Sequence, residues 1–81
     1  MSYQLMLFAS LRDKVGHNKV TLDLEGPLTV ADLLSHFFDQ FPQGKPFQDR
    51  ILIAVNQKYA SPSQIVYPGD EIALFPPVSG G

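Results

Sequence analysis

Residues 3–9 form an almost continuous apolar segment near the start of the chain. In an extended chain Leu5 and Leu7 lie on one side, and Met6 and Phe8 lie on the other. Because both alternating sides are apolar, this pattern predicts a central strand that is buried on both faces.

Three later segments also have strand patterns. Residues 20–24 alternate apolar and polar positions, which predicts a half-buried strand in a hairpin with the first, joined through a polar connection containing residues 16–18. Residues 51–55 are rich in β-branched side chains and follow a surface loop predicted at residues 42–49. Residues 71–75 form the last predicted strand.

Turn signals separate these later segments. Asn56 is expected to open a turn after the third strand, and Ile65 and Val66 are expected to pair briefly. Pro68 and Gly69 occupy the central positions of a turn, a combination that favours type II. The chain is therefore expected to reverse just before its last strand.

One segment has the period of a helix. Thr29 stands three residues before Asp32, which predicts a helix start, and Pro42 ends the pattern. Apolar residues at three- and four-residue spacing give one broad stripe: Val30, Leu33, Leu34, Phe37, Phe38 and Phe41. A phenylalanine-rich stripe of this kind is far more often core than a cofactor site, so we expect it to pack on a sheet.

The order of elements is hairpin, helix, strand, turn, strand. It predicts an α+β fold of the β-grasp (ubiquitin-like) type, a mixed sheet packed on one main helix with an extended C-terminal Gly-Gly tail. A ferredoxin-like split fold is the alternative, but residues 42–49 are too few and too polar for its second long helix. We expect a domain at 1–75 and a flexible tail at 76–81.

Composition narrows the classes of function. Eighty-one residues suffice for one domain, and the chain has no cysteine, which excludes thiol nucleophiles and suits a cytoplasmic location. A net charge of -2 without a basic cluster argues against nucleic acid as a partner. The first four residues lack the basic and apolar pattern of a signal peptide, and no apolar run is long enough to cross a membrane, so the chain is expected to be soluble and unprocessed.

Residues for catalysis are scarce in the predicted domain. His17 falls in a loop and His36 on the polar side of the helix, and neither has a local partner, so both are expected to be solvated. No metal-ligand spacing, phosphate-binding loop or nucleophile elbow is present, so no metal site is expected. The folded domain is therefore expected to be a carrier or binding module and not an enzyme that acts alone.

The tail has a different character from the rest. Pro76 and Pro77 stiffen its base, whereas Gly80 and Gly81 leave its tip without side chains. Six extended residues span roughly 20 Å, enough to enter a partner's active site and deliver the terminal carboxylate there. Taken alone, a terminal Gly-Gly is equally consistent with a frayed terminus or a cloning remnant.

The residues before the glycines make the tail more specific. The chain ends with a Gly-Asp-Glu turn, a strand and Pro-Pro-Val-Ser-Gly-Gly, in which the tail residues are Phe75, Pro76, Pro77, Val78, Ser79, Gly80 and Gly81. This run closely resembles the small subunits of molybdopterin synthase, the molybdenum-cofactor sulfur carriers. Residues 8–12, the helix and Asn56 fall in the order of that family, so the resemblance covers nearly the whole chain.

The resemblance implies a function at Gly81. In that family a separate adenylyltransferase, similar to ubiquitin-activating enzymes, uses ATP to adenylate the terminal glycine. A sulfur donor protein then supplies the sulfur of a C-terminal thiocarboxylate. The loaded tail enters the synthase large subunit and gives its sulfur to cyclic pyranopterin monophosphate, forming the molybdopterin dithiolene.

The resemblance further implies that this chain is a sulfur-donating, non-catalytic subunit of a transferase that assembles as a heterotetramer. Phe75 and Val78 are expected to make apolar contacts with partners; the less favoured alternative for Phe75 is a place in the core. Three alternatives remain at this stage. They are a thiamine-pathway sulfur carrier, a ubiquitin-like protein modifier, and a structural interaction domain, which would have no use for a free terminus.

Overall fold

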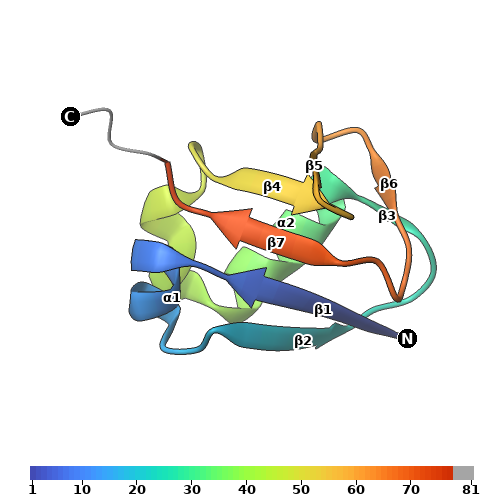
Figure 1. Cartoon of the computed structure of the whole chain (residues 1–81). Coiled ribbons are helices and arrows are strands. Elements are labelled where there is room, and N and C mark those ends of the chain that lie inside the picture. Colours follow the sequence, from blue (N-terminus) through green and yellow to red (C-terminus); the bar gives the residue numbers. More distant parts are fainter. Residues whose placement is uncertain (78–81) are drawn as a thin grey trace.

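The computed structural model describes residues 1–77, which form a mixed sheet around one main helix (Figure 1). The sheet has five strands in the order β2-β1-β7-β4-β5, and a small two-stranded sheet joins β3 to β6. The elements in chain order are β1 (Ser2–Leu7), α1 (Ala9–Val15), β2 (Lys19–Asp23), β3 (Leu28–Thr29), α2 (Val30–Gln40), the 3-10 helix η1 (Pro42–Phe47), β4 (Leu52–Val55), β5 (Lys58–Tyr59), β6 (Ile65–Val66) and β7 (Ile72–Phe75).

Strand directions confirm the predicted β-grasp arrangement. The first hairpin pairs β1 with β2 in antiparallel register, with Leu5 opposite Val20. The last strand, β7, lies between β1 and β4, parallel to β1 and antiparallel to β4. The C-terminal strand therefore runs through the middle of the sheet.

Helix α2 covers one face of this sheet, and its apolar stripe supplies much of the core. The Thr29 hydroxyl accepts a hydrogen bond of 3.1 Å from the Asp32 N–H, which confirms the predicted helix start. Four stripe residues are buried: Val30, Leu33, Phe37 and Phe38. Leu34 and Phe41 are partly buried against them. The stripe is core, as predicted.

The first strand differs from its prediction. Tyr3, Leu5 and Leu7 are buried beneath α2, but Met6 is only half-buried and Phe8 is 37% exposed. The prediction of burial on both faces is wrong because α2 covers one face of the sheet and leaves the other open. The apolar residues on the open face need another explanation.

Two connections contain helices that the sequence pattern did not predict. Residues of the first hairpin connection form α1, whose Leu11 and Val15 lie one turn apart and reach the core. Gly16, at φ 89°, ends α1 and donates its N–H to the Arg12 carbonyl. The expected loop at residues 42–49 is largely the helix η1, which packs Gly44 against the Phe38 ring.

The turns follow their predictions. Gly69 has φ 96°, and the Asp70 N–H donates to the Tyr67 carbonyl at 3.0 Å, as a type II turn requires. Asn56 and Gln57 both have positive φ and form the two-residue turn between β4 and β5. None of the helices within residues 1–77 has the length and apolar character needed to cross a membrane.

Candidate functional site

The base of the tail leaves the sheet at the end of its central strand β7. Phe75 is half-buried, Pro76 is buried and Pro77 is half-buried. The other predicted site residues, Val78, Ser79, Gly80 and Gly81, lie outside the described residues, so their roles stay predictions. The described part of the candidate site is therefore the face from which the tail starts.

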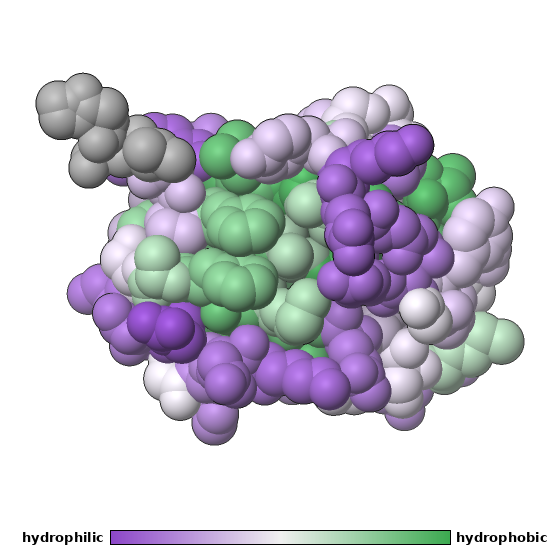
Figure 2. Space-filling view, viewed as in Figure 1, coloured by the Kyte–Doolittle hydropathy of each residue, from purple (hydrophilic) through white to green (hydrophobic). Residues whose placement is uncertain are grey.

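We call this the outer face, meaning the side of the five-stranded sheet that points away from α2. The strand registers place one row of side chains across it, which runs Lys19, Met6, Ala73, Ala54 and Tyr59 from β2 to β5. Figure 2 shows an apolar patch in the middle of this face with polar side chains around it. Solvent-exposed apolar patches of this kind mark binding surfaces.

Two aromatic rings stand at the end of the outer face nearest the tail. Phe8 and Phe75 are stacked, with ring centroids 4.8 Å apart and planes inclined by 11°. Phe8 follows β1, and its N–H donates to the Leu74 carbonyl of β7, which brings the two aromatic residues side by side. The pair forms an apolar edge directly before Pro76.

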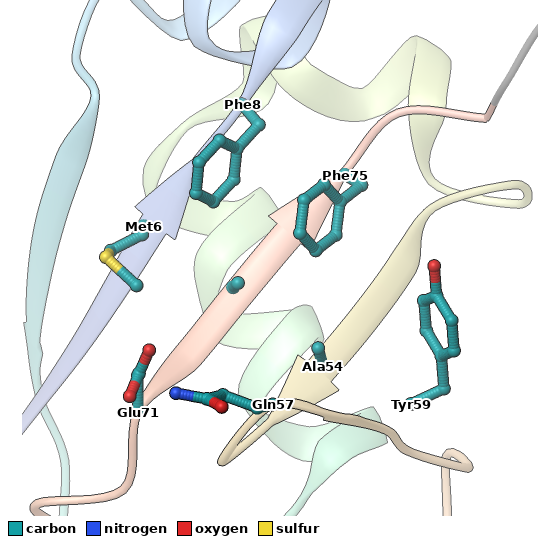
Figure 3. Close-up of a pocket in the computed structure, with 8 residues that line it drawn as sticks. Met6, Phe8, Ala54, Gln57, Tyr59, Glu71 and Phe75 are labelled. Carbon is teal, nitrogen blue, oxygen red and sulfur yellow. The ribbon is translucent and has the colours of Figure 1, made fainter.

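A shallow depression, which we call the sheet hollow, lies beside these rings (Figure 3). Its volume is about 320 Å³. It is lined by Met6, Phe8, Ala54, Gln57, Tyr59, Glu71, Ala73 and Phe75. The alanines create the depression because their short side chains lie among larger ones.

The polar end of the sheet hollow is fixed by a group of hydrogen bonds around Asn56. The Asn56 Oδ1 atom accepts from the Glu71 N–H at 2.9 Å, and its Nδ2 donates to Asp70 Oδ1 at 3.2 Å. The Asn56 N–H donates to the Glu71 carbonyl at 2.7 Å, and Asp70 Oδ2 accepts from the Tyr67 N–H at 2.8 Å. This clasp joins the β4–β5 turn to the start of β7.

Titratable groups of the described residues do not gather into a catalytic cluster. His17 and His36 are exposed, and residues 1–77 contain no group of three potential metal ligands. Burial, and to a smaller extent Asp70, raises the pKa of Tyr3, whose hydroxyl donates to the Gly26 carbonyl. The hydrogen bond to Asp23 raises the pKa of the Met1 amino group. Both groups have structural partners.

Sequence reasoning found Phe75 but missed Met6, Phe8 and Tyr59 as members of one exposed surface. A signal was available, since the first strand is apolar on both sides while the sequence predicts only one helix to cover the sheet. One apolar side therefore had to stay uncovered. Tyr59 carried no such signal, because its place depends on the pairing of β5 with β4.

Comparison with known proteins agrees with this architecture. The model of the ThiS family matches residues 5–81. The molybdopterin synthase sulfur carrier subunit of Dictyostelium discoideum is 36% identical, over 98% of this chain and 95% of that protein. The crystal structure of Haloferax volcanii small archaeal modifier protein 1 superposes with a TM-score of 0.85 at 30% identity, covering 95% of this chain and 98% of that one.

A third comparison concerns an assembly. A chain in the complex of subunits 1 and 2 of the molybdopterin-converting factor from Helicobacter pylori superposes with a TM-score of 0.69, covering all of both chains. At 20% identity this likeness shows the fold alone. The family match, which covers nearly the whole chain, goes further: this chain belongs to the ThiS family.

Proposed function

We propose that the chain is the sulfur carrier subunit of molybdopterin synthase, with Gly81 as the residue that carries sulfur. The observation that supports this most directly is the continuity between the apolar outer face and the tail. Phe75, whose ring is stacked on that of Phe8, lies one residue before Pro76, where the tail begins. A partner that binds this face is thereby placed next to the chain end.

Activation requires two steps on the terminal carboxylate. A carboxylate oxygen of Gly81 attacks the α-phosphorus of ATP on an adenylyltransferase similar to ubiquitin-activating enzymes, and pyrophosphate leaves. A nucleophilic sulfur from a sulfur donor protein then attacks the carbonyl carbon, and AMP leaves. When that sulfur is the outer atom of a persulfide, the product is an acyl disulfide; a thiol then attacks the donor's inner sulfur, forms a disulfide with it and releases the thiocarboxylate. A glycine end minimises crowding at the carbonyl carbon.

Delivery then depends on binding. The large synthase subunit binds the outer face, and the thiocarboxylate enters its active site. There its sulfur attacks a carbon of cyclic pyranopterin monophosphate and displaces an oxygen substituent, and water then cleaves the resulting thioester, which restores the Gly81 carboxylate. Tethering of the tail to a docked domain raises the effective concentration of the sulfur nucleophile. The catalytic side chains belong to the large subunit, and the heterotetramer holds two copies of each chain.

Removal of Gly81 tests the proposal. The variant lacking Gly81 and a variant extended by one alanine are expected to fold as the wild type does and to form no molybdopterin with the large subunit, the adenylyltransferase, ATP and a sulfur source. The control is Asp39→Asn, an exposed change on α2 that leaves the terminus intact. Normal product formation by the shortened chain would contradict the proposal.

A ubiquitin-like modifier is the second candidate, and the 30% identity to small archaeal modifier protein 1 favours it. Both functions activate the same carboxylate, but a modifier ends in an amide bond to a lysine of another protein. A thiamine-pathway carrier would instead pass its sulfur to a different acceptor. Intact-mass and peptide analysis of the chain from its native cells distinguishes a terminal thiocarboxylate from lysine-linked conjugates.

A further inference from the structure

The sheet hollow has an apolar end and a charged end. The stacked rings of Phe8 and Phe75 stand at one end, and the Glu71 carboxylate lies at the other beside the Gln57 side chain (Figure 3). Ala73 lies between Glu71 and Phe75 along β7 and pairs with Ala54 of β4, so the two alanines separate the two ends. A flat apolar partner surface would cover the rings and leave the charged end unused.

The backbone of Glu71 is held in place, and its exposed carboxylate forms no ion pair within residues 1–77. The clasp fixes its backbone, because Asn56 binds both the N–H and the carbonyl of Glu71. Among residues 1–77 the ion pairs join Met1 with Asp23 and Arg12 with Asp13, so Glu71 is in neither. A carboxylate without an ion partner at the end of an apolar depression favours a ligand with a cationic head.

The sheet hollow is large enough to hold one long side chain. Its volume of about 320 Å³ is at the lower limit of small-ligand pockets. Tyr59, which is 77% exposed, forms one wall and offers an aromatic surface to a cation. Met6 lines the hollow as an adaptable apolar contact for an aliphatic stem.

We propose that the sheet hollow receives one basic side chain, an arginine or lysine, from the large synthase subunit, and that Glu71 is its ion partner. This inference rests on the proposed function and specifies how the partner is recognised. The aliphatic stem of the basic residue covers Ala54 and Ala73, and its charged head reaches Glu71. An acidic residue at the same place in a wrong partner is repelled, so Glu71 also sets specificity.

Binding of the full chain to the purified large subunit from the same organism tests the inference. Glu71→Gln is expected to weaken binding about tenfold and to reduce its dependence on salt. Glu25→Gln makes the same change of charge at an exposed residue outside the hollow and is the matched control. Ala54→Leu is expected to weaken binding by filling the hollow, and thermal unfolding of each variant establishes that it is folded.

The double variant gives the sharpest result. If one basic side chain occupies the hollow, Ala54→Leu displaces it, so adding Glu71→Gln is expected to cost less than about twofold further. Binding by Glu71→Gln that equals the Glu25→Gln control would overturn the inference, as would fully independent effects of the two changes. Absence of binding by the wild-type chain would contradict the proposed function itself, and this inference with it.

Discussion

Replacement of Asn56 by alanine removes the centre of the clasp between the β4–β5 turn and β7. Two side-chain hydrogen bonds are lost, the 2.9 Å bond from the Glu71 N–H and the 3.2 Å bond to Asp70. Each bond contributes about 1 kcal/mol to the free energy of unfolding. Asn56 also has φ 52°, a left-handed conformation that costs alanine about 1 kcal/mol more than asparagine.

Together these effects predict that Asn56→Ala lowers the free energy of unfolding by about 2–3 kcal/mol. For a domain of this size, the loss corresponds to a fall in Tm of about 10 °C or more. Urea denaturation followed by circular dichroism measures the change, and an unaltered m-value shows that unfolding stays two-state.

Two further variants separate the causes. Asn56→Gly removes the hydrogen bonds but accepts the positive φ, so it is expected to be about 1 kcal/mol more stable than Asn56→Ala. Asn18→Ala, an exposed asparagine with negative φ whose side chain makes no hydrogen bond within residues 1–77, is expected to change stability by less than about 0.5 kcal/mol. A loss below about 0.5 kcal/mol for Asn56→Ala would refute the role of the clasp.

Three other changes have defined outcomes. Phe75→Ala is expected to weaken binding of the large subunit at least tenfold in a calorimetric titration. The control, Thr21→Ala on the polar part of the outer face, is expected to leave the affinity unchanged. Equal effects of the two changes would argue against the apolar edge of Phe8 and Phe75 as a binding site. Gly69→Ala is expected to lower stability by about 1 kcal/mol through its positive φ alone, since an added Cβ meets nothing within 4 Å. Because burial raises the pKa of Tyr3, the contribution of its neutral hydroxyl to the free energy of unfolding is complete below pH 10 and is lost as pH rises through the raised pKa. Tyr3→Phe is therefore expected to reduce the loss of the free energy of unfolding at alkaline pH, measured by urea denaturation at a series of pH values. An unchanged dependence of that free energy on pH would contradict the assignment.

The periodicity of apolar residues correctly predicted those elements that keep one side buried and the other exposed along their whole length. Strand β2 alternates buried and exposed side chains as its sequence does, and α2 buries the stripe that its spacing defined. The local signals at Thr29 and Gly69 were also sufficient, because capping and turn chemistry depend on neighbouring residues alone. Helix α1 was missed because its two core contacts, Leu11 and Val15, make too short a pattern to recognise.

The outer face lay beyond prediction from periodicity for a different reason. The apolar sequence pattern around a residue such as Phe8 is the same whether a helix of the same chain or a partner protein covers that residue. The pattern therefore does not distinguish a core residue from one on a binding surface. Neighbours on the face, such as Phe8 and Phe75, come from opposite ends of the chain and meet only through the pairing of β1 with β7. The clasp likewise joins residues 15 positions apart.

The central claim is that Gly81 carries sulfur, and intact-mass spectrometry tests it most directly. After incubation with the adenylyltransferase, ATP and a sulfur donor, the wild-type chain is expected to gain about 16 Da, from replacement of one carboxylate oxygen by sulfur, and to lose that mass when the large subunit and cyclic pyranopterin monophosphate are added. The chain without Gly81 is expected to show neither change. A wild-type chain that stays at its original mass under these conditions, or a shortened chain that delivers sulfur equally well, would contradict the account.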